Sequence, residues 1–361
     1  MNKKLLSVVI GAALAGSMSL AQADVSLYGQ IDASIDSVDY DSATDDINMN
    51  SNYSSLGVRG FEDLGNGVKA IFQAEFQYDM TEGNNFGGDG STAAIIDPDT
   101  DEVLFPSIDY GMSRDQWVGV EGAFGTVRAG TVFTPYHDHG AMIDPLYRTS
   151  LEGRADVGGL IDVFNGTLSS LGGGLQSTLN SDVATDTAVT GLQTNTLRYD
   201  SPDMNGLSAS AFYTFDNSEF DGEDNDPYGV GAQYKNGNIL GFADYVTSDN
   251  GGDDDAWKVG GSYTMGNIGL YGQYEDGGLI ALGLVDANIW HVGGSFTMGN
   301  TMLYAGFGQA EFDDQDGWDA WTLGAMHSLS QRTKLYAGFN QIDVDEAGEL
   351  DHFALGLRHS F

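Results

Sequence analysis

Apolar and polar side chains alternate with a period of two along most of the chain after residue 23, which is the pattern of β-strands with one apolar and one polar face. In residues 24–36, for example, Leu27 and Ile31 share one face, and Tyr28 and Asp32 share the other. A tilted strand of about 9 to 11 residues is long enough to cross a bilayer. The pattern therefore predicts membrane-spanning strands whose apolar faces meet lipid and whose polar faces meet water.

Sixteen segments of this kind follow one another, and short connections alternate with long ones. The short connections contain Gly and Asn, as in Asn66-Gly67, which supply the positive φ angles that tight hairpins need. The long connections are residues 37–53, 79–111, 134–193, 216–227, 247–256, 276–288, 311–317 and 343–350. Because short periplasmic turns and long outer loops are typical of outer-membrane barrels, we predict an all-β fold, a 16-stranded antiparallel transmembrane β-barrel.

The beginning of the chain has the composition of an export signal. Two lysines precede an apolar stretch, and Ala21 and Ala23 frame a small-residue cleavage site. An anchoring helix is the alternative, but glycines and serines dilute the stretch and no basic flank follows it. We therefore predict a signal peptide at residues 1–23 and a barrel domain at residues 24–361.

Composition narrows the classes of partner. The sequence has 51 Gly, 6 Pro and no Cys, which suits a barrel with tight turns and no disulfide framework. It has 14 basic and 53 acidic residues, and removal of Lys3 and Lys4 with the signal leaves a formal net charge of −41. This charge argues against nucleic acid as a partner. It fits either a solvated, self-repelling surface or a negative potential that attracts cations to a pore mouth.

At six places the residues resemble the Gram-negative general diffusion porins. The matching segments are Val25-Ser-Leu-Tyr-Gly-Gln-Ile-Asp32, Ser55-Leu-Gly-Val-Arg-Gly-Phe-Glu-Asp-Leu-Gly-Asn-Gly-Val-Lys-Ala-Ile-Phe-Gln73, Gly125-Thr-Val-Arg-Ala-Gly130, Asn195-Thr-Leu-Arg-Tyr-Asp-Ser-Pro202, Leu329-Ser-Gln-Arg-Thr333 and Gly356-Leu-Arg-His-Ser-Phe361. They occur in the same order as in that family and span the chain after the signal.

The resemblance implies a homotrimer in the outer membrane, with a water-filled pore in each barrel that the third outer loop narrows. It also implies an eyelet in which basic residues on the wall face acids on that loop. The expected partners are small hydrophilic solutes and ions, outer-membrane lipid and lipopolysaccharide, and the barrel assembly machinery, which reads the terminal Phe361. No cofactor or metal is implied.

Basic residues are scarce, yet five of them fall on predicted strands two to six, which are neighbours in a meander: Arg59, Lys69, Arg114, Arg128 and Arg198. Alternation turns four of these side chains toward the lumen and leaves Arg114 undecided, because Val118 and Val120 share its face. A charge facing lipid at mid-membrane costs about 2 to 4 kcal/mol. We expect a basic wall at the eyelet, with scattered structural ion pairs as the alternative.

The long segment at residues 134–193 exceeds an ordinary hairpin loop, so we expect it to fold inward as the constriction loop. Its candidate acids facing the basic wall are Asp144, Glu152, Asp156 and Asp162. For each of them, solvated loop charge is the alternative interpretation.

The predicted function is passive diffusion through a porin, with modest cation selectivity that salt weakens. A substrate-specific channel is the first alternative, and a barrel enzyme is the second. The only histidine cluster, His137 and His139, has no third ligand spaced to complete a metal site. No nucleophile elbow or phosphate-binding loop is present in the sequence, so we expect no enzymatic activity.

Overall fold

The computed structural model describes residues 24–40, 46–81, 95–96, 103–105, 113–152, 191–215, 219–220, 223–224, 226–247, 255–277, 287–312, 315–344 and 348–361. The predicted signal peptide at residues 1–23 lies outside them, as do most residues of the long connections. Within these residues, no helix is long and apolar enough to cross a membrane.

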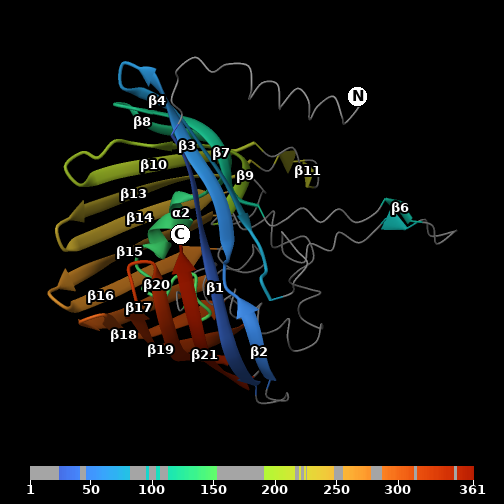
Figure 1. Ribbon diagram of the computed structural model, residues 1–361, viewed down its shortest axis with the longest axis vertical. Helices are drawn as coiled ribbons and strands as arrows, with labels where there is room; N and C mark the ends of the chain where they lie inside the picture. The colour runs from blue at the N-terminus through green and yellow to red at the C-terminus, as the bar shows by residue number, and fades with distance from the viewer. Residues whose placement is uncertain are drawn as a thin grey trace.

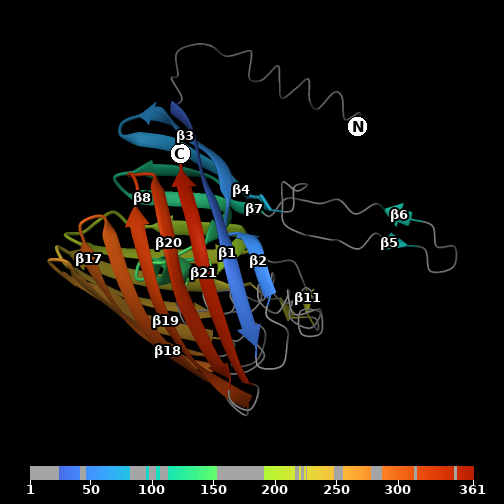
Figure 2. The ribbon, with the colours of Figure 1, turned by 60° about the horizontal axis from the view of Figure 1, so that its bottom comes forward.

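Sixteen long strands form a closed antiparallel barrel, which confirms the predicted fold class (Figure 1). They are β1 (Asp24–Tyr40), β3 (Ser55–Gly65), β4 (Val68–Gln77), β7 (Ser113–Gly122), β8 (Gly125–Phe133), β9 (Leu192–Asp200), β10 (Leu207–Thr214), β13 (Tyr228–Asn236), β14 (Ile239–Thr247), β15 (Asp255–Met265), β16 (Ile268–Gly277), β17 (Ala287–Met298), β18 (Thr301–Phe312), β19 (Gln315–Ser328), β20 (Thr333–Val344) and β21 (Gly348–Ser360). The last strand pairs with the first, from Gln30 opposite Ser360 to Tyr40 opposite Leu350. Figure 2 shows this seam, where β21 runs beside β1.

The predicted alternation of faces holds along the wall. On β1, Leu27 is 63% exposed on the outer face, whereas the side chain of Asp32 is fully buried on the inner face. Exposed large apolar side chains occur on the outside of every long strand except β8, as with Leu270 on β16, Leu303 on β18 and Leu323 on β19. An apolar exterior and a polar interior are what a membrane barrel requires.

The prediction of a loop over residues 37–53 was wrong. Strand β1 continues to Tyr40, and β2 (Asp46–Ser51) pairs with it, with Ile35 opposite Met49. Ile47 and Met49 continue the exposed outer face. Asn48 and Asn50, which alternate with these apolar residues, favoured a loop prediction, but Asn50 Nδ2 donates a hydrogen bond to Asp36 on the inner face of β1, where polar side chains belong.

Other strands also extend further than predicted at the ends that carry the long connections. Strand β18 reaches Phe312 and β19 begins at Gln315, so the predicted loop at 311–317 is largely strand. The connections at 79–111 and 216–227 contain small two-stranded sheets, β5 (Ile95–Ile96) with β6 (Val103–Phe105) and β11 (Glu219–Phe220) with β12 (Glu223–Asp224). At the end of the barrel that carries the long connections, both faces of a strand are polar. The alternation of apolar and polar residues therefore underestimates strand length there.

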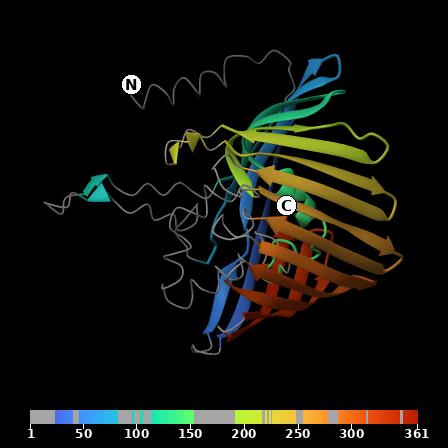
Figure 3. The same ribbon diagram turned by 180° about the vertical axis from the view of Figure 1, so that it is seen from behind.

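The described part of the third long connection, residues 134–152, lies inside the barrel. It begins with the helix α2 (Pro135–Ala141), which Figure 3 shows within the ring of strands. Beyond the helix, Leu146 and Leu151 are fully buried in a cluster with Tyr304, Met326 and Tyr336 on the far wall. The segment therefore crosses the lumen, as predicted for a constriction loop.

Candidate pore constriction

Helix α2 starts with a capped turn. The side chain of Thr134 accepts a hydrogen bond from the backbone N–H of His137, and Pro135 occupies the first turn. Ser or Thr at the cap and Pro at the first position are strong start signals, because they satisfy or remove orphan donors. The sequence Thr-Pro therefore turns the chain inward directly after β8.

Three polar contacts hold α2 against the inner wall. Asp138 Oδ2 lies 2.6 Å from Nη1 of Arg198 on β9, and His139 Nδ1 lies 2.7 Å from Asp244 Oδ1 on β14. The hydroxyl of Tyr136 donates to Glu275 Oε2 on β16 at 2.7 Å. These contacts come from separate strands, so the helix is fixed in orientation as well as in position.

His137 and Arg198 together favour the charged form of Asp138. Burial alone would raise the pKa of this carboxyl, but the hydrogen bond with His137 and the positive charge of Arg198 hold the pKa well below its usual value. Asp138 is therefore ionised under ordinary conditions, and its contact with Arg198 is a charge-assisted hydrogen bond, which is stronger than a neutral one.

Lys258 on β15 lies behind the helix and is fully buried. In register it stands opposite Asp244 on one side and Glu275 on the other. Its Nζ lies 4.0 Å from the centroid of the Tyr136 ring, and none of the residues that the structure describes is a hydrogen-bond partner for it. Lys258 thus places one positive charge between two buried carboxylates and against the π face of a helix residue.

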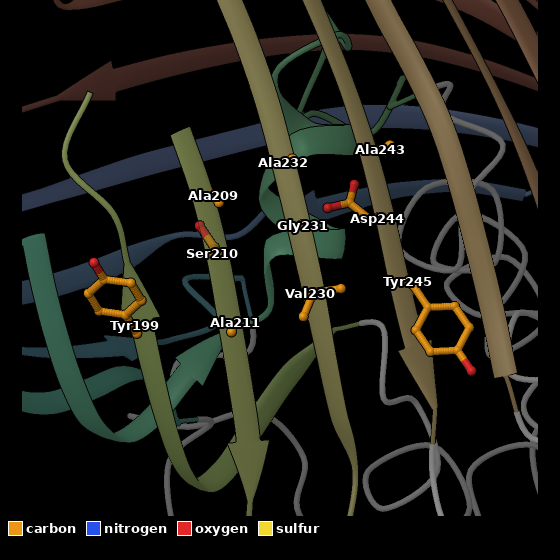
Figure 4. A pocket seen from close by; sticks show the side chains of 10 residues that line it. All are labelled: Tyr199, Ala209, Ser210, Ala211, Val230, Gly231, Ala232, Ala243, Asp244 and Tyr245. Atoms are coloured by element: carbon orange, nitrogen blue, oxygen red, sulfur yellow. The ribbon is translucent and has the colours of Figure 1, made fainter. Parts of the chain in front are cut away.

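Gly231 on β13 gives the helix room to approach the wall. A Cβ at this position would lie 2.8 Å from Pro135 Cβ and would also clash with Asp244 Oδ1. Figure 4 shows Gly231 and Asp244 on neighbouring strands, with the helix close to them. A side chain at residue 231 would therefore push α2 away from its seat.

We expect Gly231→Val to displace α2 and to increase single-channel conductance, because the helix would no longer be held in its present position. The matched control is Gly241→Val on the adjacent strand, where an added Cβ meets no atom within 4 Å. Conductance in planar bilayers measures both variants. Equal conductance of Gly231→Val and the native channel would contradict the role of this glycine.

Arg114, whose orientation alternation left open, points into the lumen. Between the pairs Ala74 with Gln116 and Phe76 with Ser113, two residues of β7 stand opposite the single residue Glu75. Such a β-bulge shifts the alternation by one residue. Arg114 is 6% exposed, and its Nε lies 3.0 Å from Glu75 Oε1.

The other basic candidates occupy different depths. Arg198 binds Asp138 and also Asp200, which in turn binds Arg128 Nη2 at 2.6 Å. Arg59 and Lys69 lie near the short-turn end of the barrel. The Arg59 guanidinium stacks on Tyr28 at 4.8 Å, and Lys69 is 3.6 Å from Glu121 with its side chain 44% exposed. The structure therefore brings Arg198 into contact with the inserted segment and Arg114 close to its residues Tyr147 and Arg148. Arg128 is joined to Arg198 through Asp200, and Arg59 and Lys69 lie apart from the segment.

The acidic candidates of the loop bind the loop itself. Asp144 Oδ1 accepts from the backbone N–H of Leu146 at 2.7 Å, and Glu152 Oε2 accepts from that of Arg148 at 2.8 Å. Both side chains are buried. Asp156 and Asp162 lie outside the described residues. Asp144 and Glu152 thus shape the loop backbone. Among the loop residues that are described, Asp138 is the acid that pairs with a wall arginine.

The sequence analysis did not select several charged residues that lie at the constriction. Arg358 on β21 lies 2.6 Å from Asp32 and donates to the carbonyl oxygens of Tyr147 and Arg148, so it joins the wall to the loop. Lys258 and Arg148 were not considered either. The alternation of faces could have predicted that the side chains of Arg358 and Lys258 point into the lumen. It could not have predicted which loop residues they contact.

Comparison with known proteins identifies the family. The sequence model described as Gram-negative porin matches residues 7–347. The chain belongs to the Gram-negative porin family. It is therefore a protein of the outer membrane, as predicted.

A curated relative of this porin is the major outer membrane protein P.IB of Neisseria gonorrhoeae, which is 29% identical over 256 residues. The match covers 68% of this chain and 56% of that protein, so the chain spans only about half the length of this relative. The anion-selective porin from Comamonas acidovorans has a similar fold, with a TM-score of 0.68 and 20% identity over 94% of this chain and all of that one. OmpT of Vibrio cholerae, in a trimer form, has a TM-score of 0.60 and 15% identity over 94% and 99% of the two chains.

The histidines of α2 do not converge on one point. His137 stacks on Phe133 at 4.0 Å and contacts the Tyr147 hydroxyl, whereas His139 pairs with Asp244. Among the residues that the structure describes, no group of three His, Cys, Asp or Glu side chains is arranged to hold a metal ion. Each histidine has a structural contact that accounts for its position.

Proposed function

We propose that this porin forms a water-filled channel for passive diffusion of small hydrophilic solutes and ions, and that it is not an enzyme. The observation that carries the proposal is a segment inserted into a closed barrel and held there by Arg198, Arg358 and Leu146, all on or against the inner wall. A polar lumen narrowed by a fixed segment selects solutes by size and charge, without bond-making chemistry.

We further propose modest cation selectivity. Four arginines at the constriction are paired with acids: Arg114 with Glu75, Arg128 and Arg198 with Asp200, and Arg358 with Asp32. Paired charges largely cancel at a distance, so the sign of the potential follows the overall balance, which is 53 acidic against 12 basic residues once Lys3 and Lys4 are removed with the predicted signal peptide. The anion selectivity in the name of the Comamonas porin belongs to that protein.

We expect reversal potentials across a planar bilayer to show a preference for K⁺ over Cl⁻ at low salt. The preference should decline as KCl rises from about 0.1 M to about 1 M, because the Debye length falls from about 10 Å to about 3 Å. Conductance itself tests for the channel. A clear preference for Cl⁻ at about 0.1 M KCl would refute the selectivity, while absence of current from inserted protein would refute the channel.

We also propose that the channel assembles as a homotrimer, contacts lipopolysaccharide, and is recognised by the barrel assembly machinery through Phe361. At the barrel seam, the backbone N–H of Phe361 donates to Gly29 O at 3.0 Å. The terminal residue is thus part of the closing strand pair. Mild-detergent electrophoresis with chemical cross-linking tests the trimer, and a monomer under all such conditions would oppose it.

A further inference from the structure

The outer surface of the barrel has a hollow where strands β9, β10, β13 and β14 lie side by side. Its volume is about 550 Å³. Tyr199 of β9 and Tyr245 of β14 stand at its two sides and are 40% and 37% exposed, which places the hollow on the outside of the wall. Figure 4 looks onto it and shows the alanines that lie between the two tyrosines: Ala209, Ala211, Ala232 and Ala243.

Strand register explains the hollow. Ala209 pairs with Ala232, and Ala232 pairs with Ala243, so three alanines stand next to one another across three strands. On the strands that follow, outward positions carry larger exposed side chains, such as Val259 on β15 and Leu270 on β16. A patch of alanine among larger side chains makes the outer surface concave at this place.

The polar side chains at the floor of the hollow point away from it. Ser210 donates a hydrogen bond to Asp200 Oδ1 at 2.7 Å, and Asp244 Oδ1 lies 2.7 Å from His139 Nδ1, both on the lumen side of the wall. The side chains that face into the hollow are therefore aliphatic or aromatic. A ligand that binds there is held by packing.

The position of the hollow indicates its occupant. It is continuous with the lipid-facing surface of an outer-membrane barrel, so hydrocarbon chains lie beside it. On the side of the long connections, Tyr213 pairs with Tyr228, and both are exposed above the alanines. On the side of the short turns, the outward residue next to Ala243 along β14 is Gly241, where an added Cβ would meet no atom within 4 Å. The hollow is thus open along β14 toward the short turns, which face the periplasm.

We propose that the hollow binds one acyl chain of a phospholipid from the periplasmic leaflet. The chain passes Gly241 and packs on the alanines between Tyr199 and Tyr245. It gains little by leaving the bilayer, because both surroundings are apolar. The gain is dispersion contact, since a concave wall touches the chain on several sides at once. The site goes beyond the proposed channel function and does not depend on it.

The hollow lies directly behind the seat of the constriction helix. Gly231 and Asp244, which hold α2 on the inner side, belong to the same stretch of β13 and β14. Figure 4 shows the helix behind these strands. A lipid chain in the hollow therefore supports, from outside, the part of the wall that carries α2.

The test is native mass spectrometry of the purified barrel in detergent after incubation with dipalmitoyl phosphatidylethanolamine. We expect the native protein to retain one lipid per protomer at detergent concentrations that remove the remainder. Dihexanoyl phosphatidylethanolamine has the same headgroup with short chains, and its retention should be about one tenth or less. Equal retention of the two lipids would show that the headgroup rather than the chain is bound, and would overturn the proposal.

A variant that fills the hollow with side chains tests its location. Ala232→Leu combined with Ala243→Leu occupies the space of the acyl chain, and leucine suits a lipid-facing position. We expect retained dipalmitoyl lipid to fall to about one tenth or less. Added lipid should raise the unfolding temperature of the native barrel and leave that of the variant unchanged. The matched control is Ala305→Leu on β18, which lies outside the hollow between the exposed Leu303 and Phe307 and should retain lipid as the native protein does.

The other outcomes each contradict the proposal. Lipid retention by the double variant equal to that of the native protein would place the bound chain elsewhere. Displacement of the phospholipid by purified lipopolysaccharide would assign the hollow to the outer leaflet. Loss of an oligomer in the double variant, with no lipid retained by the native protein, would make this face a contact between copies of the chain. Conductance of the double variant in planar bilayers should stay at the native value, so failure of the lipid site leaves the channel function standing.

Discussion

Lys258→Met should release α2 from the barrel wall and destabilise the folded barrel by about 3 kcal/mol. Lys258 is fully buried between Asp244 and Glu275 in register, and methionine would fill similar space without the charge. Two buried carboxylates would then lack the cation between them, and Tyr136 would lose its cation–π contact. Urea titration in lipid vesicles measures the loss, and single-channel recordings should show larger, noisier currents.

A double variant isolates the electrostatic cause. Lys258→Met combined with Glu275→Gln removes one charge of each sign, so it should recover a large part of the lost stability. The control is Lys235→Met on β13, where the lysine is exposed near a short turn. If the single and double variants at residue 258 were equally unstable, lost packing rather than lost charge would be the explanation.

Gly29→Val should prevent closure of the barrel in most molecules. An added Cβ would lie 2.5 Å from the carbonyl oxygen of Ser55 and 2.6 Å from the ring of Phe361. The backbone of β3 cannot move away without breaking its hydrogen bonds to β1, and the ring of Phe361 occupies the position of the added side chain. We expect a loss of about 3 kcal/mol and little heat-resistant, folded band on electrophoresis.

Gly294→Val is the matched control for this substitution. Gly294 lies on β17, and an added Cβ would meet its nearest atom at 3.7 Å, which is an ordinary contact distance. The same valine in a strand should therefore be tolerated there, as β-branched residues suit strands. Normal folding of Gly29→Val would show that the seam can absorb the added carbon.

The candidate site was predictable only in part. Alternation predicted that Arg128 and Arg198 point inward. In the structure Arg198 binds Asp138 of the inserted segment, and Arg128 binds Asp200, which Arg198 also binds. The orientation of Arg114 could not be predicted, because a β-bulge opposite Glu75 shifts the alternation. Asp144 and Glu152 were chosen as acids of the loop, but they bind backbone N–H groups of the loop, and that depends on how the loop folds.

The lipid-facing and lumen-facing sides of the wall could be predicted because they follow from a local property of each strand. Each residue of a strand points opposite to its neighbour, so side chains such as Leu27 and Asp32 show directly which face meets lipid. The same reasoning failed at β2, where polar inner-face residues made a strand look like a loop. The alternation of residues predicts which face of a strand meets lipid more reliably than it predicts where the strand ends.

The sequence by itself determined the class of this protein: an exported chain whose alternating faces and glycine turns require a membrane barrel. Only the tertiary structure decided which charges meet inside it, as when Lys258 comes to lie behind Tyr136 and Arg358 reaches the loop at Tyr147. The physical reason is that alternation is a property of neighbouring residues. Contacts across the lumen depend on strand register and loop packing, which join residues far apart in the chain.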